Sequence, residues 1–170
     1  SLGAEVEQVI LSRLKIAPCM ACNRCFATGR CVVKDDFQQL YDKTLGADGI
    51  ILASPVFFMN VSGWTKAFID RFQCLWALRY VLKQPVPLPL GGEKRRAIFL
   101  STAGSPKTKF DCTLYTVRTF LSTIDAKLIG TQCINAVDEK GAVNAYPKLL
   151  QEAYALGVLL ASGQEPEAAS

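Results

Sequence analysis

Two short runs of uninterrupted apolar residues stand out along the chain, at 49–54 (GIILAS) and 97–100 (AIFL). Runs this short and this apolar are typical of strands that are buried on both faces in a parallel sheet covered by helices. Residues 6–12 (VEQVILS) alternate between polar and β-branched positions, which predicts a further strand. With another strand near 127–135, the pattern predicts about four strands.

Helical spacing of apolar residues predicts four helices between and after these strands, over about 37–46, 63–82, 109–123 and 146–161. Strands that alternate with helices on this scale predict an α/β fold with a doubly wound parallel sheet. The prolines and glycines between Pro85 and Gly92 predict a long connection after the second helix.

Both apolar strands run directly into loops rich in Ser, Thr, Pro and Gly, which begin at Ser54-Pro55 and at Ser101-Thr102. In open α/β sheets, the loops at the carboxyl ends of the strands form the ligand crevice. We therefore expect a ligand between these two loops.

The chain has 170 residues, of which half are hydrophobic and a fifth are charged, as in ordinary globular proteins. We assign residues 1–162 to one domain and 163–170 to a flexible polar tail. The net charge of +4 is too weak to indicate nucleic-acid binding, although it suits an acidic electron-transfer partner. The short basic run 94–96 is interpreted as a solvated start of a strand.

Several functional classes are excluded by what the sequence lacks. It has no histidine, which excludes Ser-His-Asp and Cys-His catalysis, Rieske ligation and Cys/His zinc fingers. It has no run of about 18 apolar residues, so we expect no membrane span. Residues 1–5 show no signal-peptide pattern, and we expect a cytoplasmic protein.

Four of the seven cysteines lie within thirteen residues, with the spacing C-x2-C-x2-C-x5-C: Cys19, Cys22, Cys25 and Cys31. Iron–sulfur clusters are held by thiolates, and two-residue gaps let one tight turn direct three sulfurs at a single cubane. The permissive Gly29 lets the chain fold back and supply the fourth ligand. The spacing therefore favours a [4Fe-4S] cluster, with Arg24, Arg30 and Lys34 placed to offset its negative charge.

Two alternatives for the four cysteines remain open: a structural zinc site and redox-active thiols without metal. Zinc sites usually use two separated C-x2-C pairs, whereas this run is continuous. The other three cysteines, Cys74, Cys112 and Cys133, are interpreted as buried small hydrophobes.

The compact cysteine run, the following VVKDD at 32–36 and the segments 47–62 and 66–71 together resemble the iron–sulfur flavoprotein family, a branch of the NADPH-dependent FMN reductases. The resemblance implies a flavodoxin-like fold with strand order 2-1-3-4-5 and an FMN site. Its FMN-binding residues would be Ser54, Pro55, Val56, Phe57, Phe58, Asn60, Val61 and Ser62 on one loop and Thr102, Ala103 and Gly104 on the other.

Two departures from that family stand out. Phe57 occupies a position where Tyr is common, and core packing is an alternative role for Phe57 or Phe58. The first strand of the family and its phosphate loop have no counterpart, although that strand lies in the middle of the sheet. We therefore expect the native protein to begin about 30 residues earlier, because two strands would otherwise lack their central partner.

The resemblance implies an oxidoreductase that passes electrons between a one-electron carrier, such as a ferredoxin-like protein, and a two-electron small-molecule acceptor. It also implies a homodimer or homotetramer, for which the aromatic positions Phe72, Trp76 and Tyr80 could supply a contact. Two rivals are an NAD(P)H-dependent FMN or quinone reductase with zinc or no metal, and a metal-stabilised interaction module that is not an enzyme.

Overall fold

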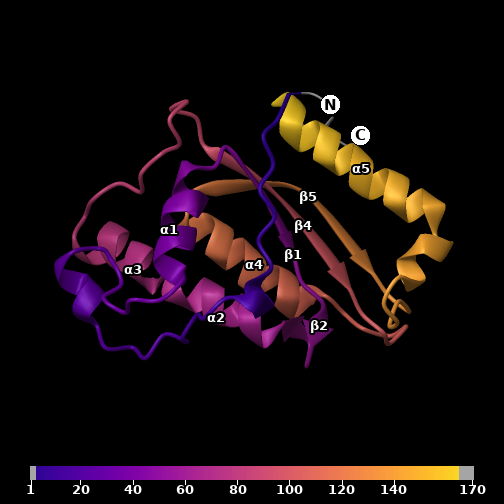
Figure 1. The fold of residues 1–170 in the computed structure, drawn as a ribbon, viewed down its shortest axis with the longest axis horizontal. Coiled ribbons are helices and arrows are strands. Elements are labelled where there is room, and N and C mark those ends of the chain that lie inside the picture. The colour runs from indigo at the N-terminus through magenta and orange to yellow at the C-terminus, as the bar shows by residue number, and fades with distance from the viewer. Residues whose placement is uncertain (1–2, 165–170) are drawn as a thin grey trace.

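The computed structural model describes residues 3–164, and its centre is a three-stranded parallel sheet with the order β1-β4-β5 (Figure 1). These strands are β1 (Gly49–Ala53), β4 (Arg95–Thr102) and β5 (Ala126–Ile134). In the register of the sheet, Ile51 pairs with Ile98 on β4. The parallel α/β architecture and three of the four predicted strands are confirmed.

Helices and one short hairpin surround this sheet. They are α1 (Phe37–Gly46), α2 (Gly63–Arg71), α3 (Gln73–Trp76), α4 (Asp111–Thr123) and α5 (Pro147–Ser162), with the 3₁₀ turns η1 (Leu11–Arg13), η2 (Arg24–Ala27) and η4 (Ala142–Ala145), the π-helical turn η3 (Ala77–Val81) and the hairpin β2 (Val56–Phe57) and β3 (Asn60–Val61). Three predicted helices are confirmed to within two residues. The fourth, over 63–82, is divided at Phe72, where the backbone leaves the α conformation.

The two faces of the sheet are covered by different helices. On one face, α5 packs so closely that a Cβ on Gly49 would lie 3.2 Å from Leu160, and one on Gly130 would lie 2.5 Å from Leu156. The other face of β4 is wholly buried and joins the core formed with α1, α2 and α4. The sheet is therefore a middle layer, as in doubly wound domains.

Five aromatic side chains form the centre of the core on that second face. Ring centroids lie 5.1 Å apart for Phe37 and Phe72 and 5.2 Å apart for Phe72 and Phe120, in edge-to-face arrangements, and Tyr41 and Phe68 complete the group. Because each buried ring contributes about 2–3 kcal/mol by its burial, this cluster fixes α1, α2 and α4 against each other. Phe72 therefore belongs to the core, whereas Trp76 and Tyr80 remain exposed.

The strand predicted over 6–12 is wrong. The chain there forms no strand, Val6 is 80% exposed, and the segment ends in the 3₁₀ turn η1. In the order 2-1-3-4-5, the strand over 6–12 would be strand 2 and would pair with strand 1. Within residues 3–164 there is no strand in the position of strand 1. The described sheet thus corresponds to the last three strands of the predicted order, 3-4-5. Its edge strand is β1, where Ile51 is half-exposed, although this strand was predicted to be covered on both faces.

The basic run 94–96 is not simply solvated, because Arg95 is fully buried. Its guanidinium donates to the carbonyl oxygens of Thr44 at 3.1 Å and Ile124 at 3.0 Å, and also to those of Leu45 and Pro87. Thr44, Leu45 and Ile124 stand at the carboxyl ends of α1 and α4, where helix carbonyls lack intrahelical partners and carry partial negative charge. Arg95 therefore joins two helix ends beneath the sheet, and burial lowers its pKa.

Two further predictions concern the periphery of the chain. Within residues 3–164, no helix is long and apolar enough to cross a membrane. Gly163, whose left-handed backbone ends α5, is the first residue assigned to the predicted tail, and residues 165–170 of that tail lie outside the described part of the chain.

Candidate functional site

The four clustered cysteines line one hollow on the surface, together with Cys74 and Arg71. Cys19 and Cys22 are exposed at its rim, whereas Cys25 and Cys31 are half-buried, and all four are free thiols. Burial raises the pKa of the Cys25 thiol, and the other three cysteines lie near enough to add to this effect. The structure therefore brings together all four residues that the sequence predicts as metal ligands.

The spacing of these sulfurs bears on the kind of metal they suit. Four thiolates around one zinc ion, with Zn–S distances of about 2.3 Å, lie about 3.8 Å from each other. In the described part of the chain, no group of three or more Cys, His, Asp or Glu side chains is gathered closely enough to hold a single ion. It is the shared lining of one hollow by the four thiols that bears on metal binding.

The backbone of the cysteine loop adopts left-handed conformations at three positions. Ala21 has a φ of 51°, Asn23 a φ of 58° and Gly29 a φ of 71°. Such conformations cost about 1–2 kcal/mol for a residue with a side chain, and they concentrate at functional sites. At the end of this loop, the Gly29 N–H donates to the Cys25 carbonyl at 2.7 Å and turns the chain toward Cys31.

Gly29→Ala is expected to lower the free energy of unfolding by about 2–3 kcal/mol. Besides the positive φ, the added Cβ would lie 2.5 Å from Leu78 Cδ1 in η3. Urea denaturation measures the effect, with Gly46→Ala as the control, because Gly46 has open space and no positive φ. A loss of equal size in both variants would show that the close approach to Leu78 is unimportant.

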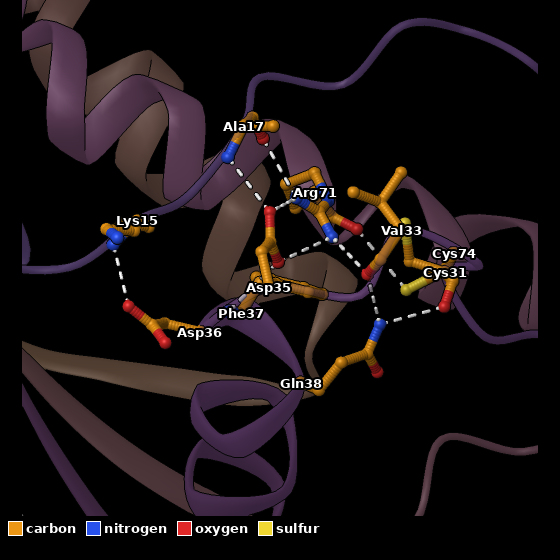
Figure 2. Close-up of polar contacts among 10 residues, drawn as sticks. All are labelled: Lys15, Ala17, Cys31, Val33, Asp35, Asp36, Phe37, Gln38, Arg71 and Cys74. Atoms are coloured by element: carbon orange, nitrogen blue, oxygen red, sulfur yellow. Dashed lines mark hydrogen bonds and ion pairs between the residues drawn. The ribbon is translucent and has the colours of Figure 1, made fainter.

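An ion pair between Asp35 and Arg71 ties both ends of the cysteine loop to α2, as Figure 2 shows. The Arg71 guanidinium donates to both carboxylate oxygens of Asp35, at 2.6 and 3.1 Å. It also donates to the Ala17 carbonyl before the loop, at 2.9 Å, and to the Val33 carbonyl after it, at 3.2 Å. The Arg71 side chain is 1% exposed, so this is a buried brace and not a surface pair.

Three side chains at the start of α1 complete the attachment of the loop. Asp36 Oδ2 accepts from the Lys15 N–H at 2.7 Å, and Asp35 Oδ2 accepts from the Ala17 N–H at 2.9 Å. Gln38 Nε2 donates to the carbonyls of Cys31 and Val33 at 2.9 and 2.8 Å (Figure 2). The sequence predicted the helix that begins near Phe37, but nothing in it indicated these contacts.

The Asp35 carboxylate titrates below its ordinary range. Burial would raise its pKa, but the hydrogen bonds from Arg71 and from the N–H groups of Ala17 and Phe37, together with the charge of Arg71, lower it overall. A carboxyl group whose pKa is lower in the folded state than in the unfolded state stabilises the fold above its unfolded value of about 3.9. This stability is lost as the pH falls through the folded pKa.

Asp35→Asn is expected to reduce the free energy of unfolding by about 2–3 kcal/mol near pH 7, because it leaves Arg71 buried without a counter-charge. The difference from wild type should shrink as the pH falls from about 4 through the lowered pKa of the folded carboxyl, because the wild-type side chain then also becomes uncharged. Denaturant unfolding over this pH range measures it. The matched control is Asp42→Asn, which breaks the exposed pair with Arg30 and should cost less than about 1 kcal/mol. A difference that is constant with pH would contradict the assignment.

The three cations that the sequence placed near the cysteines are all exposed: Arg24, Arg30 and Lys34. Arg30 pairs with Asp42 at 2.8 Å and lies 4.9 Å from the Tyr41 ring centre. The buried cation at the hollow is instead Arg71.

The three remaining cysteines differ from one another. Cys74 is buried as predicted; its thiol donates to the Arg71 carbonyl at 3.3 Å, and burial raises its pKa to about 12. Cys133 is half-buried, and burial raises its pKa. The prediction for Cys112 is wrong, since it lies on the solvent side of α4.

The loop after β1 folds into the hairpin β2–β3, whose tip is fully exposed. Phe58 and Met59 occupy the two turn positions with φ values of 48° and 64°, and the Phe58 side chain is entirely accessible to solvent. A two-residue turn with two positive φ values matches the twist of a hairpin, but it is strained for bulky residues. Phe57 is 56% exposed, so core packing is excluded for both phenylalanines.

Buried hydroxyl groups hold this hairpin against the carboxyl end of β4. Ser54 Oγ accepts from the Ser62 N–H at 2.9 Å, and Ser101 Oγ donates to the Ser54 carbonyl at 2.8 Å. Ser62 Oγ accepts from the Thr65 N–H at 3.3 Å and so caps α2. At the tip, Thr113 Oγ1 on α4 donates to the Met59 carbonyl at 3.1 Å.

The loop after β4 starts at the same edge of the sheet as the loop after β1, because the two strands are parallel neighbours. The Ala103 N–H donates to the Ile134 carbonyl at 2.9 Å, and the Ala103 side chain is buried. A Cβ on Gly104 would lie 2.6 Å from Asp138 Oδ1, so a larger residue here would displace the Asp138 side chain. The two predicted loops therefore leave one edge of the sheet, as expected for parallel strands, and the hydrogen bond from Ser101 to Ser54 joins the strand ends there.

Helix α2 connects the two candidate sites. It begins directly after Ser62 in the hairpin loop and ends at Arg71 in the cysteine hollow. Its nine residues span about 12 Å, and Figure 1 shows it between the indigo cysteine loop and β2. One short rigid element thus sets the separation of the hollow and the hairpin.

A family profile described as NADPH-dependent FMN reductase matches residues 1–139. The chain belongs to the NADPH-dependent FMN reductase family. Among curated relatives, this FMN reductase family member is 38% identical over 94 residues to an iron–sulfur flavoprotein of Methanosarcina thermophila, covering 54% of the chain and 49% of that protein. It is 46% identical over 69 residues to one from Archaeoglobus fulgidus, covering 41% of the chain and 31% of that protein.

Solved structures with low sequence identity share the flavodoxin-like fold of this FMN reductase family member. A flavone reductase superimposes with a TM-score of 0.59 at 22% identity, covering 94% of the chain and 51% of that structure. The azoreductase AzrA superimposes with a TM-score of 0.55 at 16% identity, covering 90% of the chain and 77% of that structure. The chain spans about half the length, or less, of the curated relatives named above.

Proposed function

We propose that this FMN reductase family member is an iron–sulfur flavoprotein that transfers electrons between a one-electron carrier and a two-electron acceptor. The observation that carries the proposal is the convergence of Cys19, Cys22, Cys25 and Cys31 on one hollow. Cysteines that are spread over thirteen residues meet there only because the loop takes left-handed turns and both its ends are fixed to α2. A surface loop without a ligand has no need of such a construction.

The residues of the hollow fit a [4Fe-4S] cluster. Four thiolates supply its ligands, and the half-buried positions of Cys25 and Cys31 would shield one side of it from water. The buried Arg71 cation would offset part of the negative charge. The zinc alternative would use the same four thiolates, and metal analysis separates it from the cluster.

The two loops at the edge of the sheet fit the ring of FMN. The exposed Phe57 and Phe58 offer apolar surface to a flat ring, while the buried serine hydroxyls hold the backbone of the hairpin in place. The residues proposed to bind the flavin are those that the resemblance implied: Ser54, Pro55, Val56, Phe57, Phe58, Asn60, Val61, Ser62, Thr102, Ala103 and Gly104. Ala103 would contribute only backbone, because its side chain is buried.

When bound, FMN exchanges electrons singly or in pairs, whereas a cluster passes them one at a time. The chain's own part is to hold the two sites at the ends of α2 and to exclude water from the buried half of the hollow. A small positive net charge suits an acidic, ferredoxin-like carrier in the cytoplasm. We also propose a homodimer or homotetramer, to which the exposed Trp76 and Tyr80 could contribute.

Anaerobic reduction of the purified protein tests this function. We expect reduced methyl viologen, a one-electron donor, to bleach the flavin absorption in the wild type. Cys31→Ala should slow this reaction at least tenfold, while Cys133→Ala, outside the hollow, should not. Equal rates in all three proteins would contradict the proposal. Reduction by NADPH without iron or sulfide would instead identify a flavin reductase, and a colourless zinc protein would identify an interaction module.

A further inference from the structure

Arg71 is the one buried cation in contact with the cysteine hollow among the residues that the structure describes. Its guanidinium binds both oxygens of Asp35 and two backbone carbonyls through its terminal nitrogens, and it lies 4.6 Å from the Phe37 ring centre. These contacts account for the attachment of the loop. The hydrogen bonds among them use only Nη1 and Nη2.

The third nitrogen of the guanidinium, Nε, takes no part in attaching the loop. Arg71 Nε is buried, and it has no hydrogen-bond partner within the described chain. A buried N–H group without an acceptor is rare in proteins and calls for an explanation. Arg71 and Cys31 line the same hollow, so an acceptor for this N–H lies within the site itself.

We propose that Arg71 is a positioning residue that sets the reduction potential of the cluster, with its Nε–H donating to the Cys31 sulfur. The inference rests on the proposed function, because it assigns a role to this residue only if the cysteines hold a cluster. The sulfur of a metal-bound cysteine is a thiolate, a better acceptor than the neutral thiol. Arg71 would thus bind Asp35 through Nη1 and Nη2 and the Cys31 sulfur through Nε.

The expected direction follows from charge. A cluster that gains one electron becomes more negative by one charge, so a fixed cation beside it stabilises the reduced form. Asp35 lies on the far side of the guanidinium and opposes this effect with its own charge. Removing the cation should therefore lower the potential, whereas removing the anion should raise it.

Redox titration of the anaerobic protein, followed by electron paramagnetic resonance of the reduced cluster, tests the inference. At a fixed solution potential, we expect the ratio of reduced to oxidised cluster to fall about tenfold in Arg71→Gln, which is about 59 mV for a one-electron couple. We expect it to rise at least about threefold in Asp35→Asn. Iron content, measured on the same samples, shows that each variant holds the cluster.

Two further variants keep the test decisive. Arg71→Lys keeps the charge but lacks Nε, so its potential should lie between those of wild type and Arg71→Gln. If Arg71→Gln does not hold the cluster, the lower potential of Arg71→Lys and the higher one of Asp35→Asn carry the comparison. Arg30→Gln is the matched control, because Arg30 is an exposed cation of the same loop, and it should change the ratio less than twofold.

The outcomes separate the two proposals. Shifts of opposite sign in the arginine and aspartate variants support the role of Arg71. Shifts of the same sign, or none, overturn it, because a brace that only holds the loop would respond alike to the loss of either partner. A wild-type protein without iron and sulfide overturns the proposed function itself, and the role of Arg71 with it.

Discussion

Cys25→Ala is expected to lower the iron content of the anaerobically purified protein from about four per chain to below about one, and to abolish the broad visible absorption of the cluster. Cys25 is half-buried within η2, and its carbonyl accepts from the Gly29 N–H, so alanine at this position removes a thiol from the inner side of the hollow. In the proposed cluster, the exposed thiols of Cys19 and Cys22 would bind two of the other corners.

Cys112→Ala is the control for this loss. Its thiol is exposed on α4, outside the hollow, so the variant should keep both iron and colour. Iron and acid-labile sulfide assays on both variants decide the matter. Full iron in Cys25→Ala, or equal loss in the two variants, would contradict the ligand assignment.

Arg95→Met is expected to lower the free energy of unfolding by about 4 kcal/mol, the largest effect on stability in this chain. Arg95 is fully buried and donates to four carbonyl oxygens, among them Thr44 and Ile124 at the ends of α1 and α4. Methionine fills similar space but offers no donor, so several buried carbonyls would lose their partner.

The neighbouring Lys94 supplies the control. It pairs with Asp125 at 3.1 Å on the surface, with its side chain 69% exposed. Lys94→Met should therefore change stability by less than about 1 kcal/mol. Denaturant unfolding of both variants distinguishes the two positions, and similar small effects would show that Arg95 is not the link between the helix ends.

Features that depend on local pattern could be predicted from the sequence. The apolar run of β1 and the AIFL segment of β4 identify strands, because only a parallel sheet with covered faces suits such runs. The cysteine spacing predicts convergence on one site, and Gly29 predicts the reversal that makes it possible. Parallel strands end at the same edge, so the exit of both loops from one edge of the sheet could also be predicted.

Features that depend on distant partners could not be predicted. Asp35 and Arg71 are 36 residues apart, and nothing in their spacing indicates an ion pair. Arg95 lies in the short basic run 94–96, which by itself indicates exposed residues. Its burial is explained by the carbonyls at the ends of α1 and α4, whose positions the sequence does not reveal. The alternation at 6–12 predicts a strand, but a strand also needs a neighbour to accept its hydrogen bonds.

Analysis of iron, acid-labile sulfide and zinc in the anaerobically purified protein tests the central claim most directly. The convergence of Cys19, Cys22, Cys25 and Cys31 predicts about four iron and four sulfide per chain, with little zinc. About one zinc per chain without sulfide, or no bound metal at all, would contradict it.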